Sequence, residues 1–231
     1  SFYIHNRCGN ACHVSCMGQL LYAILKAARP RQWLKNVALF TTVFFTGQLF
    51  RPEPFFISAL GFVAFCLLSS SNYIFNDVLD VEADRKHPFK KFRPIASGKL
   101  PVNVALFTSF ILLSMGLLLS KYIGQSFFIF SILFITLQYT YSVLFKKISV
   151  IDIIAITIGY VLRVYAGEAA TGSHISIWLA LAALSLALFL AIGKRRAELT
   201  LIQSYQGVLP KDTRASLSHY SEKLLDAYTS M

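Results

Sequence analysis

The amino-acid sequence predicts an all-α protein, a polytopic bundle of transmembrane helices, on three observations. Of its 231 residues, 55% are hydrophobic and only 14% are charged, and the mean hydropathy is +0.57, above what a soluble domain of this length needs for its core. The apolar residues gather in runs long enough to cross a hydrocarbon layer of about 30 Å as helices. The charged residues lie between those runs.

Six runs of about 18 or more mostly apolar residues are predicted to span the membrane. They lie at 33–50, 55–76, 102–120, 122–145, 149–171 and 175–193. The first is the weakest, because Lys35 and Asn36 interrupt its beginning. The chain then divides into an N-terminal cytoplasmic or interfacial segment, 1–32, a transmembrane domain, 33–193, and a cytoplasmic stretch with amphipathic spacing, 194–231.

The number of Lys and Arg residues alternates from one connection to the next. The connections at 85–99, 146–147 and 194–196 are rich in them, as is the segment before the first run. The opposite connections hold only Arg51, then Lys121, then none. Because basic residues stay preferentially on the cytoplasmic side, the N-terminal end and the rich connections are predicted to face the cytoplasm, in a cell inner or plasma membrane.

The second run ends in an acidic motif, N-D-V-L-D-V-E-A-D over residues 76–84. In a continuous helix, Asp77, Asp80 and Asp84 lie on one face. Asn76 lies beside them. Carboxylates this close repel one another unless they share a cation, and oxygen ligands at a water-accessible helix end suit Mg²⁺, which keeps substrate phosphate oxygens as further ligands. The motif therefore predicts a magnesium site of these four residues; the alternative is a solvated acidic helix end without a ligand.

A basic loop, R-K-H-P-F-K-K-F-R-P over residues 85–94, follows the acidic motif directly. Such a loop binds phosphate groups, or it anchors the helix end at the lipid headgroups. The acidic motif and the basic loop together are more specific than either alone, since a metal and neighbouring cations are what a diphosphate needs. We therefore expect a metal-bound diphosphate at this end of the bundle.

The N-D-x-x-D-x-x-x-D pattern at 76–84 resembles the first Asp-rich motif of the UbiA superfamily of membrane prenyltransferases. Further blocks resemble one branch of it, the decaprenyl-phosphate phosphoribosyltransferases. They are R-P-R-Q-W-L-K-N at 29–36, K-F-R-P-I-A-S-G at 91–98, Y-S at 141–142 with Lys146 and Asp152, and G-K-R-R-A-E-L at 193–199. The blocks follow one another in the order that the branch has.

The resemblance implies a bundle of nine spans, so this chain is expected to lack about the last three. Aromatic prenyltransferases of the superfamily carry a second motif, D-x-x-x-D, which helps to bind a prenyl diphosphate. In the corresponding region this sequence has K-R-R-A-E at 194–198. Only one obvious metal cluster remains, which disfavours a prenyl diphosphate as the donor.

The implied reaction transfers 5-phosphoribose from phosphoribosyl pyrophosphate to a polyprenyl phosphate of the decaprenyl type, with Mg²⁺ as cofactor, and releases pyrophosphate. Its lipid-linked product belongs to cell wall biosynthesis. By the same resemblance Asp77, Asp80 and Asp84 are catalytic. Residues expected to bind substrate are Gln32, Lys35, Asn36, Asn76, Lys91, Arg93, Tyr141, Lys146, Asp152, Arg163 and Lys194. A homo-oligomer is possible, and the sequence does not decide it.

Three charged residues lie within the fifth run. Asp152 and Arg163 are eleven residues apart, on nearly the same helix face, and Glu168 lies toward the external end. Charges inside a membrane are costly and usually mark a functional pathway, although pairs between helices are the alternative. Arg163 is expected to pair with another helix or to reach the lipid phosphate, and Glu168 has no assigned role.

Other classes of protein fit the sequence less well. A nucleic-acid-binding domain would keep the net charge of +11 on a soluble surface, without long apolar runs. A transporter would show inverted repeats and polar groups at mid-membrane, and a noncatalytic scaffold would not need the acidic motif. Zinc binding by Cys8, Cys12 and Cys16 is not favoured, because no second close pair of cysteines follows. The runner-up remains an aromatic-acceptor prenyltransferase.

Overall fold

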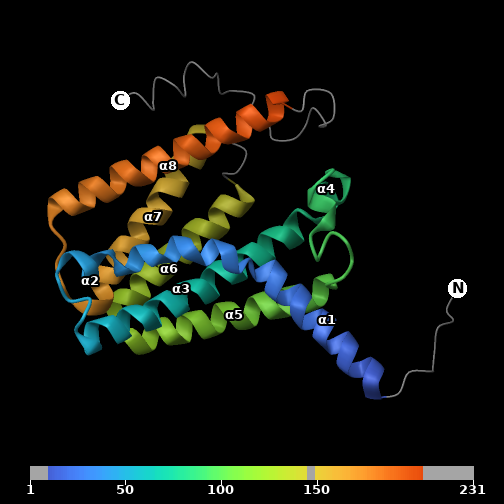
Figure 1. Cartoon of the computed structure of the whole chain (residues 1–231), viewed down its shortest axis with the longest axis horizontal. Helices are drawn as coiled ribbons and strands as arrows, with labels where there is room; N and C mark the ends of the chain where they lie inside the picture. The colour runs from blue at the N-terminus through green and yellow to red at the C-terminus, as the bar shows by residue number, and fades with distance from the viewer. Residues whose placement is uncertain (1–9, 145–148, 205–231) are drawn as a thin grey trace, which may run out of the picture.

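The computed structural model describes residues 10–144 and 149–204, and it is helical without any strand in these ranges. Five long helices make up the bundle (Figure 1). They are α3 (Pro52–Leu79), α5 (Val102–Ile123), α6 (Gln125–Val143), α7 (Ser149–Thr171) and α8 (Ile177–Ser204). Helix α3 packs against α5, and α6 against α7, which also contacts α8. The all-α prediction is confirmed.

Five helices are long and apolar enough to cross a membrane, and they correspond to the last five predicted runs. The first predicted run, 33–50, does not form one long helix. It is divided between a 3₁₀-helix, η1 (Pro30–Phe40), and a five-residue α-helix, α2 (Thr41–Phe45). The polar residues Lys35 and Asn36 belong to η1, where they meet other polar groups inside the bundle.

The N-terminal segment, which shows little pattern in the sequence, forms helix α1 (Asn10–Ala28). Its small residues Ala23 and Ala27 are buried against Ile74 of α3 and against Ile95. This packing brings the end of α1 beside the cytoplasmic end predicted for α3. Two short elements, α4 (Val81–Lys86) and η2 (Lys90–Phe92), follow α3. The predicted amphipathic spacing after residue 204 lies outside the described residues.

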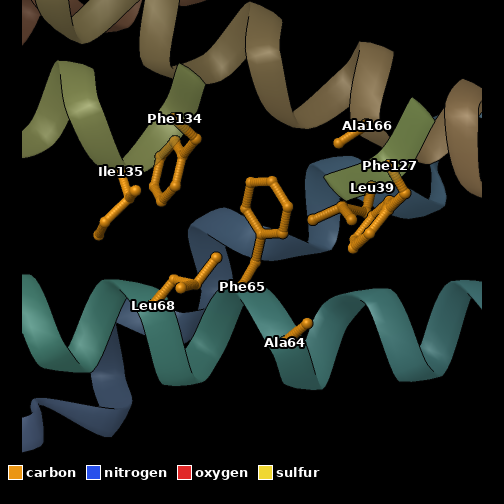
Figure 2. Packing of buried hydrophobic residues seen from close by; sticks show 8 residues of the cluster. All are labelled: Leu39, Ala64, Phe65, Leu68, Phe127, Phe134, Ile135 and Ala166. Carbon is orange, nitrogen blue, oxygen red and sulfur yellow. The ribbon is translucent and has the colours of Figure 1, made fainter. Parts of the chain in front are cut away.

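A cluster of buried hydrophobic side chains joins η1 to three helices (Figure 2). Phe65 of α3 lies between Phe127 and Phe134 of α6, with ring centroids 5.6 and 4.8 Å away. Leu39 of η1 completes the cluster together with Ala166 of α7. Aromatic pairs at these separations add to the free energy of burial. The cluster therefore fixes η1 between α3 and α7.

The contact between η1 and α7 is closest at Gly167. A Cβ atom at this position would lie 2.2 Å from the carbonyl oxygen of Leu39. Only a residue without a side chain lets the two backbones approach this closely, as small residues do between membrane helices. Gly167 therefore determines how near η1 lies to α7.

Candidate active site

The acidic motif bends the chain at Asp80. Helix α3 ends at Leu79 and α4 begins at Val81, with Asp80 between them at φ −95° and ψ 7°. The predicted helix is therefore interrupted at Asp80, although the backbone N–H of Asp84 still donates to the carbonyl oxygen of Asp80. Asp77 and Asp84 are both buried, at 2% and 3% exposed.

The remaining two motif residues form a separate contact. The side chain of Asn76 donates a hydrogen bond from Nδ2 to Oδ2 of Asp80, at 3.3 Å. Asp80 is half-buried, whereas Asp77 and Asp84 are buried. The four predicted ligands thus lie at one helix end as two pairs.

Two arginines neutralise the buried carboxylates. Arg93 Nη1 donates to Asp84 Oδ2 at 2.6 Å and to Asp77 Oδ1 at 3.1 Å. Arg29 Nη2 donates to the same Asp77 Oδ1 at 2.5 Å, and its guanidinium lies over the ring of Tyr73. Buried carboxylates need such partners, since an unpaired charge away from water is strongly destabilising. Two negative and two positive charges therefore balance at this site.

Arg29 was missed as a site residue by sequence reasoning. Its position at the head of the R-P-R-Q-W-L-K-N block was the available signal. Sequence alone did not predict that the chain turns at Arg29, with φ 54° and ψ 64°, so that the residue comes beside α3. Arg93 was predicted to bind phosphate, and the structure places it on the carboxylates.

The donor set fits a divalent cation. A single nitrogen, Arg93 Nη1, lies within hydrogen-bond distance of both Asp77 and Asp84, so the two carboxylates already converge on one positive group. Carboxylate oxygens are the ligands that Mg²⁺ prefers. In the described part of the chain no three His, Cys, Asp or Glu residues are grouped closely enough to hold an ion. Water and phosphate oxygens would therefore have to complete the coordination.

A second polar cluster lies deeper in the bundle, around Arg163 of α7. Arg163 is 3% exposed and donates from Nε to Asn36 Oδ1 at 2.8 Å and from Nη1 to the Gly159 carbonyl at 2.6 Å. The Asn36 oxygen also accepts from Ser69 Oγ at 3.5 Å, and its Nδ2 donates to Cys66 Sγ at 3.3 Å. Arg163 thus bonds to a residue of another element, η1, and its reach to a lipid phosphate stays a prediction.

Lys35 is close enough to both clusters for Arg163 and Arg29 to act on its charge. It is half-buried in η1, outside the five candidate spans. Burial first, and then the positive charges of Lys194, Arg163 and Arg29, together lower the pKa of Lys35 from 10.5 to about 8. All three neighbours that act on the pKa of Lys35 are cations, so the region around it is strongly electropositive.

The other predicted site residues are placed less closely. Lys91 is exposed, with its ammonium over the ring of Phe92, and does not join either cluster. Gln32 and Tyr141 are half-buried, on η1 and α6. Lys146 and the side chain of Asp152 lie outside the described residues, as do Cys8 and the side chains of Cys12 and Cys16. Their proposed roles stay predictions.

The fold and the site define an integral membrane protein whose helical bundle carries two polar clusters, one at the end of α3 and one deeper, around Arg163. The sequence matches the model of the UbiA prenyltransferase family over residues 37–197, which is more than half of the chain. The chain belongs to this family.

Two similar curated proteins are both named decaprenyl-phosphate phosphoribosyltransferase. The protein from Corynebacterium glutamicum is 41% identical over 182 residues, which cover 77% of this chain and 55% of that protein. The protein from Mycolicibacterium smegmatis is 35% identical over 205 residues, covering 87% of this chain and 64% of that protein. The chain therefore spans between half and two thirds of the length of these relatives.

Solved structures show the same architecture. A UbiA homologue from Archaeoglobus fulgidus, bound to GPP and Mg²⁺, superposes with a TM-score of 0.73 at 22% identity, covering 90% of this chain and 73% of that one. The same homologue bound to Cd²⁺ gives a TM-score of 0.70 at 21% identity, with 90% and 73% covered. At this identity the likeness shows the fold.

Proposed function

We propose that the protein to which this chain belongs transfers 5-phosphoribose from phosphoribosyl pyrophosphate to a polyprenyl phosphate, and releases pyrophosphate. The observation that carries the proposal is the pair of buried carboxylates, Asp77 and Asp84, which converge on Arg93, with Arg29 also bound to Asp77. The names of the relatives from C. glutamicum and M. smegmatis support this choice of substrates.

The site is suited to a metal-bound diphosphate because its carboxylates and arginines, which are paired with one another, can exchange these partners for a metal ion and a phosphate. Asp77 and Asp84 would hold the Mg²⁺ of a metal-bound diphosphate, and Arg29 and Arg93 would bind its phosphate oxygens. Each charge keeps an opposite partner in this exchange. Bound Mg²⁺ would supply positive charge next to the departing pyrophosphate. The Mg²⁺-bound and Cd²⁺-bound relatives of the same fold support a divalent cation.

The chemical step needs little beyond positioning. A lipid phosphate oxygen attacks C1 of the ribose, the bond from C1 to the pyrophosphate oxygen breaks, and pyrophosphate leaves with the electron pair. The phosphate monoester is already anionic at neutral pH, so no general base is required. Arg29 and Arg93 would stabilise the charge that builds on the leaving group, and the buried site would hold both reactants in line.

We further propose that the site faces the cytoplasm, where phosphoribosyl pyrophosphate would reach it from water. The carboxylate cluster adjoins the basic loop, and basic residues favour the cytoplasmic side. The inner or plasma membrane, cell wall biosynthesis and a homo-oligomer are further proposals that follow from the resemblance.

A second candidate is the transfer of a prenyl group from a prenyl diphosphate. A digeranylgeranylglyceryl phosphate synthase from Sulfolobus acidocaldarius is 34% identical over 107 residues, which favours this reading for that part of the chain. The basic stretch at 194–198 opposes it, because a second acidic motif would hold the prenyl diphosphate.

Donor dependence distinguishes the two candidates. The full-length protein in detergent is given Mg²⁺, a polyprenyl phosphate and labelled phosphoribosyl pyrophosphate, and the lipid fraction is extracted. We expect an acid-labile labelled lipid. Labelling that comes only from a prenyl diphosphate would reject the phosphoribosyl transfer and support the second candidate.

The pKa of Lys35 predicts a pH dependence of substrate binding. Because this pKa is lowered to about 8, Lys35 is positive below that pH and loses its charge as the pH rises through it. The charged hydrogen bond from Lys35 to a substrate phosphate is then lost. KM for the substrate whose phosphate Lys35 binds is therefore expected to rise roughly tenfold between about pH 7 and pH 9. The measurement is KM against pH.

Two variants separate this effect from other titrations. Lys35→Arg keeps its charge over the whole range, and its KM is expected to stay flat. Lys26→Met removes an exposed lysine from α1 and is expected to keep the wild-type profile. A rise of KM in Lys35→Arg equal to that of the wild type would contradict the assignment.

A further inference from the structure

Arg163 is a buried cation that forms no salt bridge with any described side chain. It is 3% exposed, and its hydrogen bonds go to the neutral oxygens of Asn36 and Gly159. Its guanidinium lies over the rings of Phe134 and Tyr160, with 4.6 and 5.6 Å to the centroids. No described residue accepts a hydrogen bond from its third nitrogen, Nη2.

This arrangement lacks a negative charge. A guanidinium stays protonated in proteins, and neutral partners and ring faces replace only part of its hydration. Lys35 adds a second positive charge close enough for Arg163 to act on its pKa. Two cations in a buried region repel each other unless they share an anion. The cluster is therefore complete only when an anionic ligand is bound.

We propose that Arg163 binds a phosphate monoester at a site distinct from the carboxylate pair, and that Asn36 is the residue that positions Arg163. This proposal rests on the proposed function for the identity of the ligand. The guanidinium presents its donors in a fork that matches phosphate oxygens. Asn36 fixes the fork, because its oxygen accepts from Arg163 while its Nδ2 donates to Cys66 Sγ.

Both proposed substrates carry a phosphate monoester, one at the lipid head and one on C5 of the ribose. The depth of the Arg163 site in the bundle favours the phosphate of the lipid. Asn36 contacts Cys66, which precedes Asp77 by eleven residues on α3, or about 16 Å along the helix axis. A lipid enters from the hydrocarbon layer, whereas a water-soluble donor enters at the helix end. We therefore assign the site to the acceptor lipid.

Asn36→Asp is the sharpest test, because it adds the missing charge with almost no change in size. The new carboxylate would lie where Oδ1 now accepts from Arg163 at 2.8 Å and would compete with a phosphate. We expect the Kd of farnesyl phosphate to rise roughly tenfold to a hundredfold. We expect Tm without ligand to stay constant or to rise, since the buried cation gains a partner.

The measurement is calorimetric titration of the full-length protein in detergent micelles, without Mg²⁺ and without donor. Farnesyl phosphate is the probe and farnesol is the uncharged control, whose binding should not change. Arg163→Met is expected to weaken binding of farnesyl phosphate to a similar extent. Arg51→Met is the matched control, because it removes an exposed arginine at the opposite end of α3 and should bind like the wild type.

Two results would overturn the proposal. Wild-type affinity for farnesyl phosphate in either Asn36→Asp or Arg163→Met would show that the cluster binds no lipid phosphate. Weaker binding of phosphoribosyl pyrophosphate alone, titrated in a separate arm, would move the site to the donor. Because no turnover is measured, these results are independent of product formation, on which the proposed reaction depends.

Discussion

Replacement of Asp84 by Asn is expected to lower kcat/KM for phosphoribosyl pyrophosphate by roughly a hundredfold to a thousandfold. Asp84 is 3% exposed and accepts from Arg93 at 2.6 Å, so it would combine the proposed metal-ligating oxygen with an ion pair at one position. The amide keeps the volume but removes the charge. The measurement is the initial rate of labelled-lipid formation at saturating polyprenyl phosphate and Mg²⁺, with Tm recorded in parallel.

Glu82→Gln is the matched control for Asp84→Asn. Glu82 lies on the same short helix, α4, but it is exposed and has no part in the carboxylate cluster. Its replacement is expected to leave kcat/KM within about twofold, since isolated surface charges contribute little. If Asp84→Asn and Glu82→Gln have the same rate, the carboxylate pair does not carry the reaction.

The largest expected loss of stability comes from Gly167→Ala. The added methyl group would lie 2.2 Å from the Leu39 carbonyl oxygen and 3.0 Å from the Leu39 carbonyl carbon. Backbone atoms of η1 cannot rotate away as a flexible side chain does, so η1 has to move. We expect a loss of about 3 kcal/mol, the upper part of the range for overpacked sites. Tm in detergent and the monodisperse fraction on gel filtration measure it.

Gly18→Ala is the control for Gly167→Ala. A Cβ at Gly18 of α1 meets nothing within 4 Å. Alanine should therefore stabilise that helix slightly, by about 0.5–1 kcal/mol. The close approach of η1 to α7 would be refuted by a Gly167→Ala protein that melts at the wild-type temperature.

Much of the fold could be predicted because the membrane constrains the sequence strongly. Hydropathy located the five long helices, since each must satisfy its own backbone in the hydrocarbon layer. The region 33–50 could not be predicted in this way. Its polar residue Asn36 is buried and bonds to α3 and α7, and those contacts are made by residues far away in the sequence.

The sequence predicted which residues form the candidate site but not how they contact one another. The acidic spacing indicated Asp77 and Asp84, but helix periodicity did not predict the interruption of the helix at Asp80. The bond between Asn36 and Arg163 joins residues 127 apart in the chain, so no local pattern reveals it. Whether these residues act on substrate stays a prediction.

The turn at Arg29 has a consequence for engineering this protein. Its backbone, at φ 54°, is one that glycine adopts freely and that costs a residue with a side chain on the order of 1 kcal/mol. The same residue holds Asp77 with its guanidinium. Glycine at this joint would relieve that backbone cost but would take away one of the two cations on buried Asp77, so selection for heat resistance alone is expected to keep Arg29, because the lost ion pair costs more than the strain.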